Sequence, residues 1–218
     1  MAAELGKLAG TQFVEAPNHF EAQGAQDGAC WASGALNSVA ASLMKIANDV
    51  RLMNSGPRCG FAEVTLPAIQ PGSSIMPGKV NPVICEAVTM VSAQVMGNHT
   101  AITVGAQWGQ LDLNVMLPMM AKNLLESVQL LAAASRVFAD KALAGFIANE
   151  DTCRGYIEIS PSMATALNPL IGYDKAAEIA KRSFKERRPV RELAAEMTTL
   201  SKAEIDAALD PEIGRAHV

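Results

Sequence analysis

The residues best suited to chemistry in this chain of 218 residues lie in one short segment, residues 72–82. It reads Gly-Ser-Ser-Ile-Met-Pro-Gly-Lys-Val-Asn-Pro and contains two hydroxyl groups, one ammonium group and one carboxamide, but no carboxylate. These groups all donate hydrogen bonds, and such bonds are strongest when the acceptor is charged. Gly72 and Gly78 permit positive φ, while Pro77 and Pro82 stiffen the chain. The composition predicts a loop that holds an anion; a plain polar connection between two helices is the alternative.

The residues that bind metals most often in proteins are scattered along the chain. No C-x-x-C pair is present, and the histidines are far apart, so we expect no zinc site and reduced thiols. We expect His19 to be a structural or surface residue and give His217 no functional role. The residues concerned are Cys30, Cys59, Cys85, Cys153, His19, His99 and His217.

Long helices on both sides of the loop must position it. Residues 18–51 predict one long helix, because Asn18 is a suitable N-cap and Glu21 follows three residues later, as in a capping box. Apolar residues recur there at steps of three and four, which predicts a buried stripe. We expect a second helix over residues 83–106. We expect a third over residues 111–144, in which Pro118 predicts a kink or a restart.

The composition favours closely packed helices over sheets. Half of the residues are hydrophobic, 18% are charged and only 5% are aromatic, while alanine and methionine are abundant. We therefore predict an all-α protein. A partial long-helix bundle would occupy residues 1–144, and a small C-terminal helical domain would occupy residues 145–211, where charge, proline and glycine increase.

Charge and hydropathy restrict the partners. The net charge of −4 gives no indication of a nucleic-acid partner, and we interpret the basic segment 181–191 as a solvated helix. No stretch reaches the roughly 18 apolar residues of a membrane span, and no signal peptide opens the chain. We expect a cytoplasmic protein without a membrane partner.

The segment 72–82 resembles the signature sequence of the fumarase/aspartase superfamily. The resemblance extends over residues 1–211 and corresponds to the C-terminal half of a class II fumarase. It implies a central bundle of long helices followed by a small helical domain. It also implies reversible dehydration of malate to fumarate, a step of the tricarboxylic acid cycle, without a metal or organic cofactor. The other segments that resemble class II fumarases are residues 13–22, 42–51, 55–58, 112–115, 166–169 and 171–177.

The resemblance assigns roles to the polar residues of the loop. Ser73 matches the serine that acts as the catalytic base, and Ser74, Lys79, Val80 and Asn81 match positions that bind the substrate. A serine hydroxyl is a poor base by itself, so amide dipoles and a nearby cation must stabilise its alkoxide. Lys79 can provide that charge and also hold a substrate carboxylate. Asn81 offers two donors and an acceptor to the same region.

Glu86 matches the glutamate that orients the catalytic histidine of another subunit; the alternative is a carboxylate that is simply favoured in the first turn of a helix. The resemblance implies a homotetramer in which three subunits meet at each active site. The family's catalytic histidine precedes the matched half and has no counterpart here. We therefore expect one wall of a composite site, and a chain that is inactive alone. We expect residues 212–218 to be a non-native tail, because a sequencing-adapter sequence can encode them.

Other interpretations stay open. Residues 82–84 and 109–116 are closer to aspartate ammonia-lyase, whereas Gly78 and residues 85–87 and 171–175 favour fumarase. Argininosuccinate and adenylosuccinate lyases differ around the lysine and fit less well. A hypothesis of another class is a non-catalytic helical assembly module, or the separately encoded half of a split enzyme.

Overall fold

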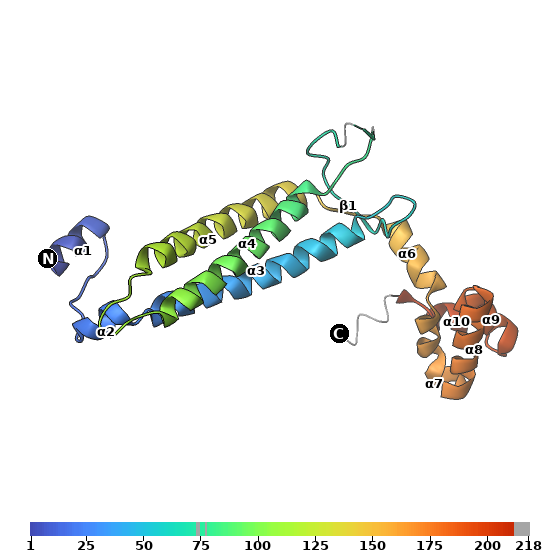
Figure 1. Cartoon of the computed structure of the whole chain (residues 1–218). Helices are drawn as coiled ribbons and strands as arrows, with labels where there is room; N and C mark the ends of the chain where they lie inside the picture. The colour runs from blue at the N-terminus through green and yellow to red at the C-terminus, as the bar shows by residue number, and fades with distance from the viewer. Residues whose placement is uncertain (73–74, 77, 212–218) are drawn as a thin grey trace. The chain divides into compact units, whose positions relative to one another are not determined.

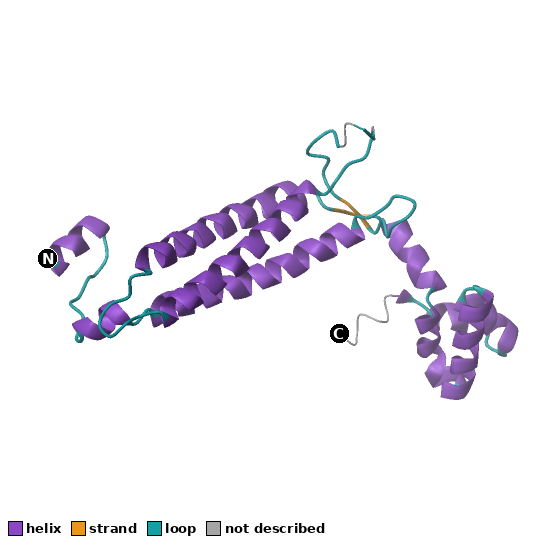
Figure 2. Cartoon of the chain, in the orientation of Figure 1, coloured by secondary structure: helices purple, strands orange, loops and turns teal. Residues whose placement is uncertain are grey.

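The computed structural model describes residues 1–72, 75–76 and 78–211, and it confirms the prediction of an all-α fold (Figure 2). The chain divides into two compact units, Met1–Ile147 and Ala148–Val218, each of which is described by itself. Ser73, Ser74 and Pro77 of the predicted anion loop lie outside the described residues, and so does the expected tail, residues 212–218.

Three long helices form the body of the first unit. They are α3 (Asp27–Met53), α4 (Val83–Gln107) and α5 (Leu117–Val137), which pack side by side (Figure 1). Alanine at the contacts lets the helix axes approach closely. One cluster of buried side chains lies along the middle of the bundle, and a second lies where α3 ends and α4 begins. The first consists of Ala40, Val95 and Leu131, and the second of Ala47, Val50, Cys85, Val88, Phe138 and Ala142.

The single helix predicted over residues 18–51 is wrong, because the chain forms two helices there. Helix α2 (His19–Gly24) ends at Ala25, whose backbone is extended, before α3 begins. Asn18 caps α2 as predicted, since its side chain accepts hydrogen bonds from the backbone of the first turn. A Cβ on Gly24 would lie 2.9 Å from the carbonyl oxygen of Leu111, and Asn114 donates its backbone N–H to Gln23. Contact with a distant segment therefore ends α2.

The second predicted helix is confirmed by α4, whereas the third starts later than predicted. Leu111 has a φ of 54° and is fully exposed. Helix α5 begins at Leu117, so Pro118 lies in its first turn, where the missing N–H removes no intrahelical bond. Pro118 therefore marks a restart rather than a kink. The π-helical segment η1 (Phe138–Leu143) continues α5 directly and contributes Phe138 and Ala142 to the core.

Short elements complete the first unit. Helix α1 (Ala2–Ala9) ends at Gly10, which takes a left-handed conformation. The strands β1 (Val64–Thr65) and β2 (Ile147–Ala148) form a two-stranded sheet where this unit ends. The peptide bond between Gly56 and Pro57 is cis.

The second unit consists of short helices around its own core. Leu167, Ile179, Val190, Leu193 and Ile205 are among its fully buried side chains. Its last helix starts with a complete capping box between Ser201 and Glu204. The elements are α6 (Glu150–Ile159), the 3₁₀ segment η2 (Pro161–Leu167), α7 (Asn168–Ile171), α8 (Tyr173–Glu186), α9 (Val190–Met197) and α10 (Lys202–Ala208).

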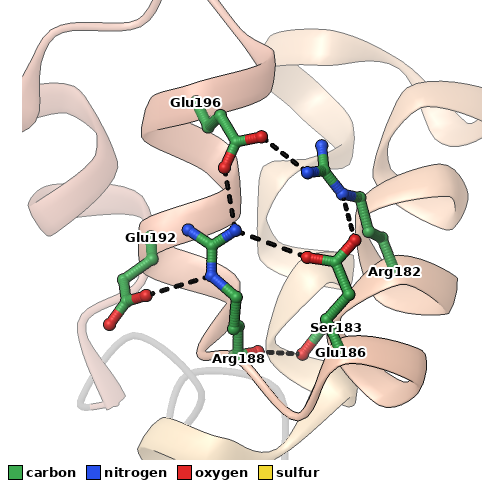
Figure 3. Close-up of polar contacts among 6 residues, drawn as sticks. All are labelled: Arg182, Ser183, Glu186, Arg188, Glu192 and Glu196. Atoms are coloured by element: carbon green, nitrogen blue, oxygen red, sulfur yellow. Dashed lines mark hydrogen bonds and ion pairs between the residues drawn. The ribbon is translucent and has the colours of Figure 1, made fainter.

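A network of ion pairs connects α8 with α9 (Figure 3). Arg182 contacts Glu186 and Glu196, each at 2.6 Å, and Arg188 contacts Glu196 at 2.9 Å and Glu192 at 3.4 Å. Hydrogen bonds from Arg188 and then Arg182 lower the pKa of Glu196, and the bond from Arg182 is the largest cause that lowers the pKa of Glu186. These arginines of the basic segment are therefore paired within the unit.

Within the part of the chain that the structure describes, none of the helices combines the length and apolar character that crossing a membrane would require.

The network predicts that α8 and α9 loosen in acid. A carboxyl group whose pKa is lowered by folding, as that of Glu196 is, stabilises the fold at a pH above its ordinary pKa, and this contribution is lost as the pH falls through the lowered pKa. In Arg188→Gln the α8 and α9 peptides should lose hydrogen-exchange protection at a higher pH than in the unaltered chain. Arg187→Gln is the matched control, because Arg187 has no ion pair among the described residues. Identical acid profiles for the two variants would contradict the prediction.

Candidate functional site

A hollow of about 560 Å³ lies where α3 ends and α4 begins. Its walls come from the last turns of α3, from the turn that follows α3, and from the segment that leads into α4. Lys79, Val80, Asn81 and Glu86, four of the six residues predicted for the site, line it. The structure therefore brings the loop and the start of α4 together around one space.

Glycine closes the base of the loop. Gly72 has a φ of 83°, and a Cβ placed on it would lie 1.6 Å from the carbonyl oxygen of Lys79. Two chain segments that approach this closely leave room for hydrogen alone at Gly72. The backbone N–H of Lys79 donates to Met76 at 3.2 Å, which forms a turn just before the site residues. Gly78 also has a positive φ, of 81°, but it faces open space.

The predicted site residues differ in exposure. Lys79 and Val80 are exposed, whereas Asn81 and Glu86 are half-buried. The ammonium group of Lys79 has no ion-pair partner among the residues that the structure describes, so it is available to an anion. Ser73 and Ser74 lie outside these residues, and their roles remain predictions.

A second cation lines the hollow. The Nη2 atom of Arg51 lies 4.0 Å from Oε1 of Glu86, and both side chains are about two-fifths exposed. The Nη1 atom of Arg51 donates to Oδ1 of Asn48 at 3.4 Å, one turn earlier on α3. The guanidinium group therefore lies between a carboxamide on α3 and a carboxylate on α4.

The turn after α3 forms the opposite wall and has its own hydrogen bonds. The hydroxyl of Ser55 donates to the carbonyl of Leu52 at 2.5 Å and accepts the backbone N–H of Phe61 at 3.1 Å. The side chain of Asn54 accepts the backbone N–H of Leu66 at 3.1 Å. These bonds connect the turn to its own neighbours and do not involve the loop.

The core beneath the hollow fixes both helix ends. Val50 and Cys85, which precede Arg51 and Glu86 in the sequence, are buried in the same cluster together with Phe138. Burial raises the pKa of the Cys85 thiol, although the charge of Arg51 partly opposes this. Cys85 is therefore suited to packing and poorly suited to nucleophilic chemistry.

The remaining candidate residues lie away from the hollow. His19 is exposed and its Nε2 lies 3.2 Å from Glu15, while His99 Nδ1 lies 3.0 Å from the hydroxyl of Ser33 between α4 and α3. The four cysteines are free thiols. Among the described residues, no group of three or more His, Cys, Asp and Glu side chains is arranged to hold a metal ion.

The charge and the hydrogen-bond donors of the hollow are of the types that suit a carboxylate. Lys79 provides positive charge and Asn81 adds amide donors at the edge of one half-enclosed space, and Arg51 lies on its wall beside Glu86. Charged donors fixed in place stabilise a developing negative charge without reorganising during a reaction. Sequence reasoning missed Arg51, Asn48 and Ser55 as site residues. They nevertheless lie in segments 42–51 and 55–58, whose sequences resemble the same family.

Two family profiles match parts of the chain, and known relatives match nearly all of it. The profile of the family described as Lyase matches residues 1–97, and that of Fumarase C C-terminus matches residues 163–213. The chain is 54% identical over 209 residues to fumarate hydratase class II 2 from Pseudomonas aeruginosa, which covers 96% of this chain and 46% of the relative. It is 51% identical over 212 residues to the mitochondrial fumarate hydratase of Mus musculus, covering 97% of this chain and 42% of the relative.

A solved structure gives the same result for the fold. The recombinant class II fumarase from Schistosoma mansoni matches with a TM-score of 0.91 and 37% identity, covering all of this chain and 49% of that one. The chain thus spans about half the length of the relatives that it matches.

Gly72 provides a test of the loop. Gly72→Ala should displace Lys79, because the new methyl group overlaps its carbonyl oxygen, and the amides of residues 75–86 should exchange hydrogen several-fold faster in mass spectrometry. Gly78→Ala shares the positive φ but meets no atom within 4 Å, so its effect should be smaller. Exchange in Gly72→Ala that equals that of the unaltered chain would contradict the close approach.

Proposed function

The chain belongs to the class II fumarase family, and we propose that it provides one wall of an active site that interconverts malate and fumarate. The observation that carries this proposal is the hollow that gathers Lys79, Asn81 and Glu86 beside Arg51. Removing a proton from the carbon next to a carboxylate places negative charge on that carboxylate. Cationic and amide donors fixed around it lower the barrier to this step.

In this proposal Ser73 acts as the base. Its alkoxide takes the carbon-bound proton, the electron pair forms the double bond, and the hydroxyl group leaves as water after it receives a proton from an acid. Lys79 stabilises the alkoxide and holds a substrate carboxylate. Ser74 and Asn81 donate hydrogen bonds to the same carboxylate, and Val80 contributes to the contact surface.

Glu86 orients a histidine that another chain contributes. Its position in the first turn of α4 supports this role, because the carboxylate is half-exposed at the edge of the hollow. The chain spans about half of its relatives' length, so we expect the histidine to come from the part that it does not match. A chain that provides only this wall should then be inactive by itself.

The surface of the bundle supports association with other chains, and we propose the homotetramer that the resemblance implies. Trp31 of α3, Met90 of α4 and Leu125 of α5 are 80%, 66% and 63% exposed. Removing apolar surface from water is favourable by about 25 cal/mol per Å², and large exposed apolar areas are typical of interfaces. We also place the protein in the cytoplasm, where free thiols such as those of this chain persist.

Aspartate ammonia-lyase is the second candidate. It is favoured by the sequence of residues 109–116, which connect α4 to α5 and resemble that enzyme more closely. The curated relatives named above are fumarate hydratases, which supports elimination of water over elimination of ammonia. A non-catalytic assembly module would form helical oligomers and catalyse neither reaction.

Complementation tests the proposal. The chain should not hydrate fumarate alone, but together with the N-terminal half of the Pseudomonas aeruginosa relative it should, measured by the loss of fumarate absorbance. In the complemented assembly Ser73→Ala should lower kcat by about 10²- to 10⁴-fold, the usual contribution of a positioned base.

Lys79→Met should raise KM and lower kcat, because it removes a charge that contacts substrate and transition state.

Lys202→Met is the matched control, since it removes a lysine from the second unit and should leave both constants unchanged. Release of ammonia from aspartate without hydration of fumarate would identify the second candidate. Stable helical oligomers that catalyse neither reaction would favour the assembly module. A wild-type rate in Ser73→Ala would refute the assignment of the base.

A further inference from the structure

We propose that Arg51 is a positioning residue that holds the carboxylate of Glu86 on the wall of the hollow. The inference rests on the proposed function, in which Glu86 orients a histidine from another chain. It concerns a residue that the resemblance in the loop does not identify, because Arg51 lies on α3, more than twenty residues before Gly72.

The contacts of Arg51 suit this role. One side of its guanidinium group donates to Asn48 Oδ1 at 3.4 Å, and Nη2 lies 4.0 Å from Glu86 Oε1. A guanidinium group is planar and carries its donors in a fixed fork, so fixing one side directs the other. Asn48 on α3 therefore fixes the direction in which Arg51 presents its charge to α4.

The backbone at Glu86 is held by its buried neighbours, but the Glu86 side chain is not. Val50 and Cys85 are packed in one core, which fixes the backbone of Arg51 and Glu86. The carboxylate itself is about two-fifths exposed, and in the described residues Arg51 is the cation within ion-pair distance of it. A half-exposed carboxylate without a partner would sample several rotamers. Arg51 selects among them.

Stability alone does not explain the pair. Ion pairs of this exposure contribute roughly 0–1 kcal/mol to folding. A cation in the last turn of α3 also interacts favourably with the helix dipole, but that effect needs no partner on α4. A third role, direct binding of a substrate carboxylate by Arg51, predicts a different kinetic result from positioning.

Kinetics of the complemented assembly separate these roles. Arg51→Gln should lower kcat by about 10- to 100-fold, as misplacement of a catalytic group does, with KM changed less than about twofold. The double variant Arg51→Gln/Glu86→Gln should be no slower than Glu86→Gln, because a residue that acts through Glu86 has nothing left to position. Lys45→Gln is the matched control: it removes a cation from the same helix, where Lys45 pairs with Asp49 rather than with a residue of the hollow.

Two kinetic results would overturn the inference. A raised KM with unchanged kcat in Arg51→Gln would assign Arg51 to substrate binding. Additive losses of kcat in the double variant would show that Arg51 does not act through Glu86. An Arg51→Gln variant as active as Lys45→Gln would show the same.

A second measurement separates this inference from the proposed function. If the complemented wild-type assembly hydrates no fumarate, the proposed function fails, and side-chain NMR of the chain alone still reports on Arg51. We expect restricted rotation of its guanidinium group in the unaltered chain and faster rotation in Glu86→Gln, where the contact with Asn48 alone remains. Free rotation in the unaltered chain would overturn the positioning role whatever the activity.

Discussion

The candidate site depends on one small core, to which the end of α3, the start of α4 and η1 all contribute. Val50 and Cys85 are buried there against Phe138 and Ala142. Successive residues of an α-helix point about 100° apart, so burial of these two side chains sets the directions of the next ones, Arg51 and Glu86, beside the core. The polar wall of the hollow is therefore a consequence of apolar packing directly beneath it.

Backbone constraints in two connecting segments complete the hollow around that core. Gly72 closes against the carbonyl of Lys79, a contact that no side chain permits. The turn after α3 is held by the Ser55 hydroxyl, which bonds to the chain on both sides. Because each backbone segment is held by its own contacts, Lys79 and Asn81 line the same hollow as the end of α3.

Features that depend on local sequence could be predicted, and those that depend on distant contacts could not. The cap at Asn18 and nearly the full extent of α4 follow from side-chain type and periodicity. The break at Ala25 does not, because it arises where residues 109–114 approach Gly24. Arg51 was missed for the same reason: its charge looks like that of any helix-end cation until α4 brings Glu86 beside it. Periodicity and motif describe one segment at a time, whereas the site is made by pairs of segments.

The chemistry of the hollow bears on the proposed assembly. Its described walls carry the cations Lys79 and Arg51 and the carboxylate Glu86, while His19 and His99 lie elsewhere on the helices. A trans-elimination, which the proposed reaction would be, needs a base on one side of the substrate and an acid on the other. A single wall that carries cations can bind the dianionic substrate from one side. It cannot also place a catalytic group on the opposite side of that substrate. On the proposed function a second chain must face this wall, and the exposed apolar side chains of α3, α4 and α5 provide a surface on which it could pack. Assembly and catalysis would then be two consequences of the same helices.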